Sequence, residues 1–260
     1  MNQQAIINRT LSNLPLGAIR YFDSIGSTND EALAWAANDA KDLSIVIANE
    51  QTSGRGRLDR PWFTPPSTAL AFSLILRPTA DEKPHLSRIV GLGALAVADA
   101  LGILGLAPEI KWPNDILLNG HKVAGILIEL VWSGEAVDCV VVGIGVNVAK
   151  GSVPTTDILR FPAISLEHVL GEAPDRNKLL HDILTSFISL RPHLRSDSFI
   201  KSWEKSLAYY GQQVQVEMGT EQSVKGKIIG LESDGSLKLR DENGKIVPVR
   251  FGDVRLRPFA

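Results

Sequence analysis

Residues 54–62 read Gly-Arg-Gly-Arg-Leu-Asp-Arg-Pro-Trp and lie between two apolar runs, at 43–48 and 69–76. The two glycines let the backbone approach a ligand closely. The three arginines carry forked cations that grip a phosphate or carboxylate in two places, and the tryptophan adds a broad apolar cover. We therefore interpret the stretch as a loop that closes over a small anionic ligand. A plain solvated loop is the alternative that this local chemistry leaves open.

The segments on both sides of this loop predict an α+β fold, a mixed or antiparallel sheet with flanking helices. Apolar or alternating segments indicate strands at 19–22, 43–48, 69–76, 110–112, 116–118, 123–131 and 136–146. Helices are expected at 87–104, 178–194 and 199–210, with Gly211 ending the last one. Another helix opens at Ser27, where Thr28 and Glu31 have capping-box spacing. Strands and helices do not alternate regularly, which argues against a doubly wound fold.

The sequence changes character after Gly211. Short strands are expected at 214–216, 224–229, 237–239 and 246–249, and Asp234-Gly235 and Asn243-Gly244 are tight-turn signals between them. This pattern predicts a small β barrel of five strands and about 50 residues, close to the lower size limit for a domain. We therefore divide the chain into a domain at 1–209 and a C-terminal domain at 210–260.

Composition excludes several classes of protein. The formal net charge of −2 argues against a general nucleic-acid binder. A single cysteine, Cys139, excludes an internal disulfide and suits a reducing cytoplasm; because it lies in an apolar run, we expect a buried residue and not a nucleophile. The stretch 89–107 contains Asp99 and four glycines and stops at Pro108, so we interpret it as a buried helix and expect no membrane partner.

Four other features carry chemistry, and each has a structural alternative. Residues 111–115 read Lys-Trp-Pro-Asn-Asp, which is also an ordinary strand-ending turn. Lys122 follows a tight turn and could be a solvated edge residue, and Glu129 in the same strand is more often an outward-facing carboxylate. Residues 143–147 read Gly-Ile-Gly-Val-Asn, without the third glycine of a dinucleotide-binding loop. Residues 27–29, Ser-Thr-Asn, could be only a helix cap.

Taken in order, these segments resemble the biotin–protein ligases. The matching motifs are Ser27-Thr-Asn29, Gln51 with the 54–62 loop, Lys111-Trp-Pro-Asn-Asp115, Lys122-x-Ala-Gly-Ile-Leu-Ile-Glu129 and Gly143-Ile-Gly-Val-Asn147. The C-terminal segment is similar to the SH3-like barrel that ends these enzymes, so the resemblance covers about residues 19–260. Each motif alone is modest, but five in the correct order are specific.

The resemblance implies a two-step ligase reaction. Biotin and MgATP give biotinyl-5′-AMP and pyrophosphate, and the biotinyl group then passes to a lysine of a biotin carboxyl carrier domain. The first step must bring the biotin carboxylate against the α-phosphate, two anions that repel each other. Positioning and preorganised cations are what a protein can add to such a step.

The resemblance also implies roles for individual residues. Lys122 and Arg57 would stabilise the crowded anions, and Asp115 would orient the incoming lysine amine or accept its proton. The biotin-binding set is Ser27, Thr28, Asn29, Gln51, Arg55, Gly56, Arg57, Lys122, Gly143 and Gly145. The ATP-binding set is Arg55, Trp62, Asn114, Asn147 and Lys122, with Trp62 covering the adenylate and the two asparagines meeting the adenine. No protein side chain is assigned to Mg²⁺.

The chain departs from the family pattern at Asp59, where the loop commonly has glycine, so Arg60 is left outside the predicted site. Only some 18 residues precede the first expected strand, fewer than a DNA-binding domain needs, so we expect no DNA-binding repressor function. An exposed strand edge can support a homodimer. The rival functions are a lipoate or octanoate ligase of the same fold family, and a sensor that binds biotin or nucleotide without turnover.

Overall fold

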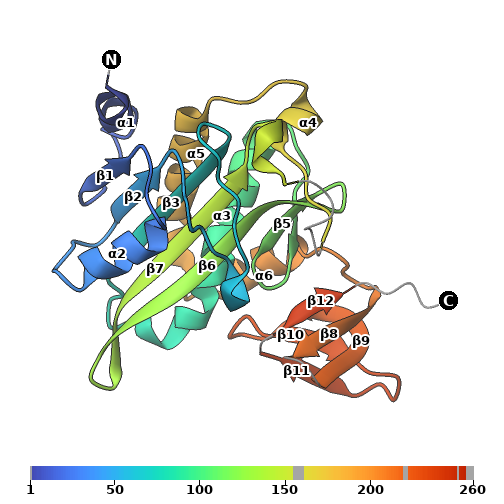
Figure 1. The fold of residues 1–260 in the computed structure, drawn as a ribbon. Helices are drawn as coiled ribbons and strands as arrows, with labels where there is room; N and C mark the ends of the chain where they lie inside the picture. The colour runs from blue at the N-terminus through green and yellow to red at the C-terminus, as the bar shows by residue number, and fades with distance from the viewer. Residues whose placement is uncertain (1, 155–160, 219–221, 251, 256–260) are drawn as a thin grey trace.

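The structure is a computed structural model and describes residues 2–154, 161–218, 222–250 and 252–255. Its centre is a seven-stranded sheet in the order β1-β2-β3-β7-β6-β5-β4 (Figure 1). The strands are β1 (Ile19–Phe22), β2 (Ser44–Ala48), β3 (Ala69–Leu76), β4 (Glu109–Lys111), β5 (Asp115–Leu118), β6 (His121–Ser133) and β7 (Ala136–Asn147). Only the β1–β2 pairing is parallel within this sheet. The predicted mixed sheet is confirmed, because each apolar run forms a strand.

Helices cover both faces of this sheet (Figure 1). Helices α3 (Ile89–Ile103) and α5 (Arg176–Leu190) pack on one face, where large side chains such as Phe72 and Leu74 form the main core. Helix α2 (Thr28–Ala36) packs on the other face through alanines. The remaining helices are α1 (Gln3–Thr10), α4 (Leu166–Leu170) and α6 (Asp197–Lys205). The helix expected at 199–210 is therefore too long, since α6 ends at Lys205.

Helix α3 and the turn before it contain most of the apolar segment that was expected to be a buried helix and not a membrane span. Lys83–Ile103 is long and apolar enough to cross a membrane by length and composition, but 67% of its most apolar window is buried inside the protein. Its buried face contacts β6, β7 and α5. This environment is that of a core helix, because the apolar surface is covered by the protein itself.

Small residues open a space on the α2 face of the sheet. Gly145 in β7 pairs with Ala71 on one side and Gly125 on the other, and the next row joins Ser73, Gly143 and Leu127. Side chains of alternate strand residues point to the same face, so these two rows lie side by side under α2. Five of the six residues are glycine, alanine or serine, which leaves the sheet surface nearly bare at this point.

The C-terminal domain is a five-stranded antiparallel sheet in the order β11-β10-β9-β8-β12. Its strands are β8 (Gln213–Met218), β9 (Gln222–Leu231), β10 (Leu237–Arg240), β11 (Ile246–Val249) and β12 (Asp253–Arg255). The turn before β10 contacts the larger domain: Trp112 Nε1 donates to the Gly235 carbonyl at 2.9 Å, and Arg88 Nε donates to the Ser233 carbonyl at 2.7 Å. The boundary at 209/210 stays a prediction, and residues 256–260 of the predicted domain lie outside the described residues.

Candidate functional site

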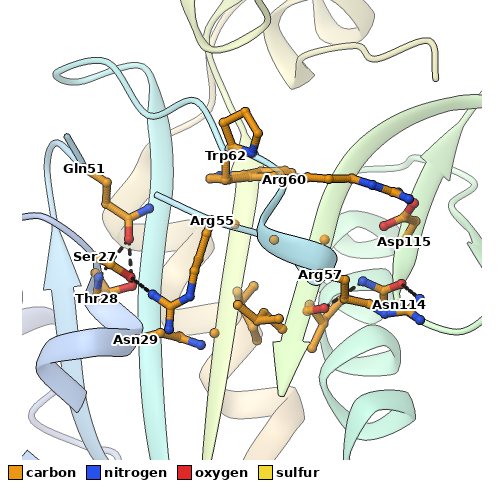
Figure 2. Close-up of a pocket in the computed structure, with 18 of the residues that line it drawn as sticks. Ser27, Thr28, Asn29, Gln51, Arg55, Arg57, Arg60, Trp62, Asn114 and Asp115 are labelled. Atoms are coloured by element: carbon orange, nitrogen blue, oxygen red, sulfur yellow. Dashed lines mark hydrogen bonds between the residues drawn. The ribbon is translucent and has the colours of Figure 1, made fainter. Parts of the chain in front are cut away.

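A cavity lies over the bare part of the sheet, between the start of α2 and the 54–62 loop; together with its opening to solvent it holds about 710 Å³ of empty space (Figure 2). It brings together every predicted site residue except one. The predicted residues that line it are Ser27, Thr28, Asn29, Gln51, Arg55, Gly56, Arg57, Trp62, Asn114, Asp115, Lys122, Gly143 and Gly145. They come from positions up to 118 residues apart (145 − 27), so only the tertiary fold makes them one site.

Asn147 is the predicted residue that the structure does not bring to the cavity. It is buried, and its Nδ2 donates to the Ile164 carbonyl at 3.2 Å. Arg60, which sequence reasoning left out, does line the cavity. The backbone explains why Asp59, next to Arg60, can stand where the family commonly has glycine. Asp59 has φ +54°, a conformation that glycine adopts freely and aspartate tolerates.

One end of the cavity is neutral, buried and internally hydrogen-bonded. Gln51 Oε1 accepts from the Thr28 backbone N–H at 2.8 Å and from the Thr28 hydroxyl at 3.1 Å. The Ser73 hydroxyl lies 2.8 Å from Thr28 Oγ1 and 2.5 Å from Asn29 Oδ1. We refer to these four residues with Ser27 as the head end. Since its donors and acceptors are already held in place, it can recognise a neutral polar group without rearranging.

The expected capping box at this helix start is wrong. The N-cap is Ser27, whose side chain makes no capping hydrogen bond, and Thr28 is already helical. The Thr28 N–H, which has no acceptor within the helix, donates instead to Gln51, 23 positions along the chain. Glu31, the other half of the expected box, pairs with Arg20 at 2.6 Å. The three polar residues at 27–29 are thereby turned toward the cavity and are not merely a cap.

The first arginine of the loop reaches the head end (Figure 2). Arg55 donates to Ser27 Oγ at 3.3 Å, to Asp30 at 2.5 Å and to both carboxylate oxygens of Glu129 at 2.8 Å. Partial burial alone would lower the pKa of Arg55, but the hydrogen bonds to Glu129 and Asp30 raise it above its ordinary value. The sequence favoured an outward-facing carboxylate for Glu129 and assigned it no role in the site, because nothing local links it to Asn29, which lies 100 positions earlier and donates to it.

Trp62 covers the bare part of the sheet. A β-carbon at Gly145 would collide with its indole ring, and one at Gly125 would lie 3.5 Å from the ring. The indole Nε1 is buried without a hydrogen-bond partner among the described residues. An unpaired buried N–H costs about 1–3 kcal/mol, so a ligand oxygen that accepted from it would stabilise the covered state.

The opposite end of the cavity concentrates charge, and we refer to Arg57, Asn114, Asp115 and Lys122 as the charged end. Lys122 Nζ lies 2.6 Å from Asp115 Oδ1 and 5.3 Å from the centre of the Trp62 ring. Arg57 Nη1 donates to Asn114 Oδ1 at 3.2 Å (Figure 2). Two cations and one carboxylate converge here, so the end carries a net positive charge that suits a phosphate or carboxylate.

Lys111 and the C-terminal domain support the charged end from outside. Lys111 Nζ lies 3.7 Å from Asp115 Oδ2, and the Gly252 carbonyl accepts from Arg57 Nη1 at 3.3 Å. Within the described ranges, no group of three or more His, Cys, Asp or Glu residues could hold a metal ion. A Mg²⁺ ion at this end would therefore depend on phosphate oxygens for most of its ligands.

The chain is similar to known proteins over nearly its whole length. The profile of the "Biotin/lipoate A/B protein ligase family" matches residues 21–147, and that of the "Biotin protein ligase C terminal domain" matches residues 209–257. A biotin–[acetyl-CoA-carboxylase] ligase of Paracoccus denitrificans is 36% identical over 85% of this chain and 93% of its own length. The chain belongs to the biotin protein ligases. The predicted α+β fold class and the resemblance to the biotin–protein ligases are thereby confirmed.

Two further relatives place this ligase within the family. The bifunctional ligase/repressor BirA of Bacillus spizizenii is 34% identical to it, over 91% of this chain and 73% of its own length. The solved structure of a biotin protein ligase from Aquifex aeolicus in complex with biotin and ATP is 29% identical, with a TM-score of 0.78 over 92% of this chain and 98% of that one. The likeness therefore spans both domains.

Proposed function

We propose that this ligase joins biotin and ATP into biotinyl-5′-AMP with release of pyrophosphate, and then transfers the biotinyl group to a lysine of a biotin carboxyl carrier domain. The observation that carries this proposal is the difference in polarity between the two ends of the cavity. Its head end offers fixed neutral hydrogen-bonding groups, and its charged end offers cations. Biotin has the matching pattern, a neutral ureido head and an anionic carboxylate tail.

The head end holds the ureido group, and the loop holds the tail. Ser27, Thr28, Asn29 and Gln51 face the ureido group. Gly143 and Gly145 form the floor of the cavity, where the lack of side chains lets Asn29 and Trp62 lie directly against the sheet beside the ligand. Arg55 and the Gly56 backbone lie where the chain of biotin passes from one end to the other. These residues orient the substrate, and the fixed hydrogen bonds among them reduce the entropy lost on binding.

The charged end brings two anions together. Lys122 Nζ bridges the biotin carboxylate and the α-phosphate, and Arg57 neutralises the phosphate, so that the carboxylate oxygen can attack phosphorus. In the structure Lys122 is paired with Asp115; the substrate anions replace that partner, which releases the Asp115 carboxylate. Asp115 is then placed to orient the carrier lysine amine or accept its proton in the second step.

ATP occupies the same end. Trp62 covers the adenylate, and Asn114 contacts the nucleotide. A contact from Arg55 to the nucleotide would require this side chain to leave Glu129 and Asp30 at the head end. Mg²⁺ neutralises phosphate charge when it arrives with ATP. Asn147 does not line the cavity, and its Nδ2 donates to the Ile164 carbonyl, so a contact from it to adenine requires a rearrangement of the site.

The test is direct. The purified protein, labelled biotin, MgATP and a carrier domain should give covalent label on the carrier, and biotin should drive exchange between ATP and pyrophosphate. Exchange driven by lipoate in place of biotin would favour the lipoate ligase. Binding of both ligands without pyrophosphate release would favour a sensor, which has no need for two cations at the carboxylate end.

Several expectations stay predictions. They are the 209/210 boundary between the domains, a cytoplasmic location, the absence of DNA and membrane partners, and a homodimer through an exposed strand edge. A shift of a biotin-operon operator fragment by this chain would contradict the expectation about DNA.

A further inference from the structure

We propose that Glu129 is a positioning residue for the biotin end of the cavity, an inference that rests on the proposed function. Glu129 belongs to β6 but is not one of the residues that line the cavity. It contacts two residues that do: its Oε2 accepts from Asn29 Nδ2 at 2.6 Å, and its two oxygens accept from Arg55 Nη2 at 2.8 Å each. Glu129 therefore acts on biotin only through these side chains.

The carboxylate determines which way the Asn29 amide points. A carboxylate paired with an arginine accepts hydrogen bonds and donates none, so the amide nitrogen must face Glu129. The amide oxygen must then face Ser73, whose hydroxyl is 2.5 Å away. The Asn29 amide lies directly against Gly143, where a β-carbon would collide with it. Glu129 thus sets the order of donors and acceptors along the head end.

The same carboxylate holds the beginning of the ligand-binding loop. Arg55 bridges Glu129 on β6 and Asp30 on α2, and its side chain is only 22% exposed. A two-point hydrogen bond of this kind fixes the guanidinium in position as well as direction. With Arg55 seated before the ligand arrives, less loop entropy remains to be lost on binding.

This arrangement assigns Glu129 an effect on biotin affinity and not on the chemical step. The residue lies seven positions along β6 from Lys122, which faces the reacting anions, and its hydrogen bonds go to Asn29 and Arg55, which orient the ureido head and the loop. Loss of a charged hydrogen-bond partner lowers affinity by about tenfold to a hundredfold. We therefore expect Glu129→Gln to raise KM for biotin by that factor, with kcat and KM for ATP near those of the wild type.

The matched control is Glu135→Gln. Glu135 is an exposed carboxylate in the turn between β6 and β7, so the substitution makes the same change of charge in the same hairpin. Its KM for biotin should equal that of the wild type. Thermal unfolding of both variants shows whether either has lost stability. The inference would be overturned if Glu129→Gln left KM for biotin unchanged or lowered it. It would also be overturned if KM for biotin and KM for ATP rose by the same factor.

A double-mutant cycle tests the route through Asn29. If Glu129 acts by orienting that amide, the loss in Glu129→Gln/Asn29→Ala must be smaller than the product of the two single losses. Independent, multiplicative losses would contradict the inference. Failure of the proposed function is distinguishable, because then the wild type and Glu135→Gln would also show no biotin-dependent exchange of ATP and pyrophosphate.

Discussion

The two ends of the cavity are built on different principles. The head end is formed mainly by the start of α2 and by β3, and all its residues except the half-buried Gln51 are buried. Its hydrogen bonds join protein groups that need not part when a neutral ligand arrives. The charged end rests on the loop and on β5 and β6, and its cations are already engaged, Lys122 with Asp115 and Arg57 with Asn114 (Figure 2). Anions must replace these partners. The groups that bind the ligand are therefore prearranged at the head end, whereas at the charged end the ligand must displace the partners that these groups already have.

The largest expected effect is at the charged end, where transition-state charge develops. Lys122→Ala should lower adenylate formation by about 10²–10³-fold, the scale for losing one preorganised cationic donor. The measurement is biotin-dependent exchange of ATP and pyrophosphate, with Glu135→Gln as the control, because Glu135 is exposed and lies outside the cavity. Near-wild-type pyrophosphate release by this variant would remove Lys122 from the mechanism.

Two glycine substitutions, one at each end of the cavity, compare how far the surrounding side chains can move to accommodate an added methyl group. The methyl of Gly143→Ala would collide with the buried Asn29 amide, whereas that of Gly125→Ala would lie 3.2 Å from the flexible end of Lys122. Overpacking a rigid site costs about 1–3 kcal/mol, so Gly143→Ala should weaken biotin binding by about tenfold to a hundredfold. Gly125→Ala should weaken it much less. Calorimetric titration with biotin measures both; equal losses would show that the head end is not the stiffer one.

The 54–62 loop should become ordered when ligands bind at the charged end. Residues 54–62 contain two successive residues of positive φ, Leu58 at +56° and Asp59 at +54°, and Leu58 is 74% exposed. We expect proteolysis after Arg55 or Arg57 to slow when biotin and ATP are both present, because ligand contacts then hold the loop. Biotin with ATP should protect more than biotin alone. Equal cleavage with and without ligands would mean that the loop does not close over them.

The C-terminal domain should affect only the charged end, through its contact with Arg57. Gly252 has φ +140°, and a β-carbon there would lie 2.6 Å from Val216 Cγ1, whereas Gly244 has φ +81° with nothing within 4 Å. Gly252→Ala should disturb the carbonyl that accepts from Arg57 and lower adenylate formation by about two- to tenfold, the worth of one hydrogen bond. Gly244→Ala is the control in the same domain. A loss confined to KM for biotin would contradict this prediction.

Sequence reasoning recovered what depends on local pattern. The apolar run at 69–76 became the fully buried strand β3, and the motifs around Arg57 and Lys122 met in one cavity. It missed what depends on distant partners. Gln51 replaces the expected capping box at Thr28 from 23 positions away, and Glu129 reaches Asn29 across 100 positions. No spacing rule reports such contacts, because they exist only once β6 lies beside β7 and α2 crosses above them.

The smallest effect on activity is expected at Cys139, which lies under α2 on the same face of the sheet as the cavity but outside it. Burial raises the pKa of this thiol from 9.0 to about 11. The folded protein therefore holds the proton where the unfolded chain has lost it, so this contribution to stability is full below pH 9.0 and is lost as the pH rises to about 11. Cys139→Ala should leave adenylate formation unchanged. The difference in unfolding free energy between wild type and variant, measured by urea titration, should shrink across that pH range. A constant difference would show that the thiol does not titrate differently on folding, and rapid modification of the native thiol at neutral pH would show that it is not buried.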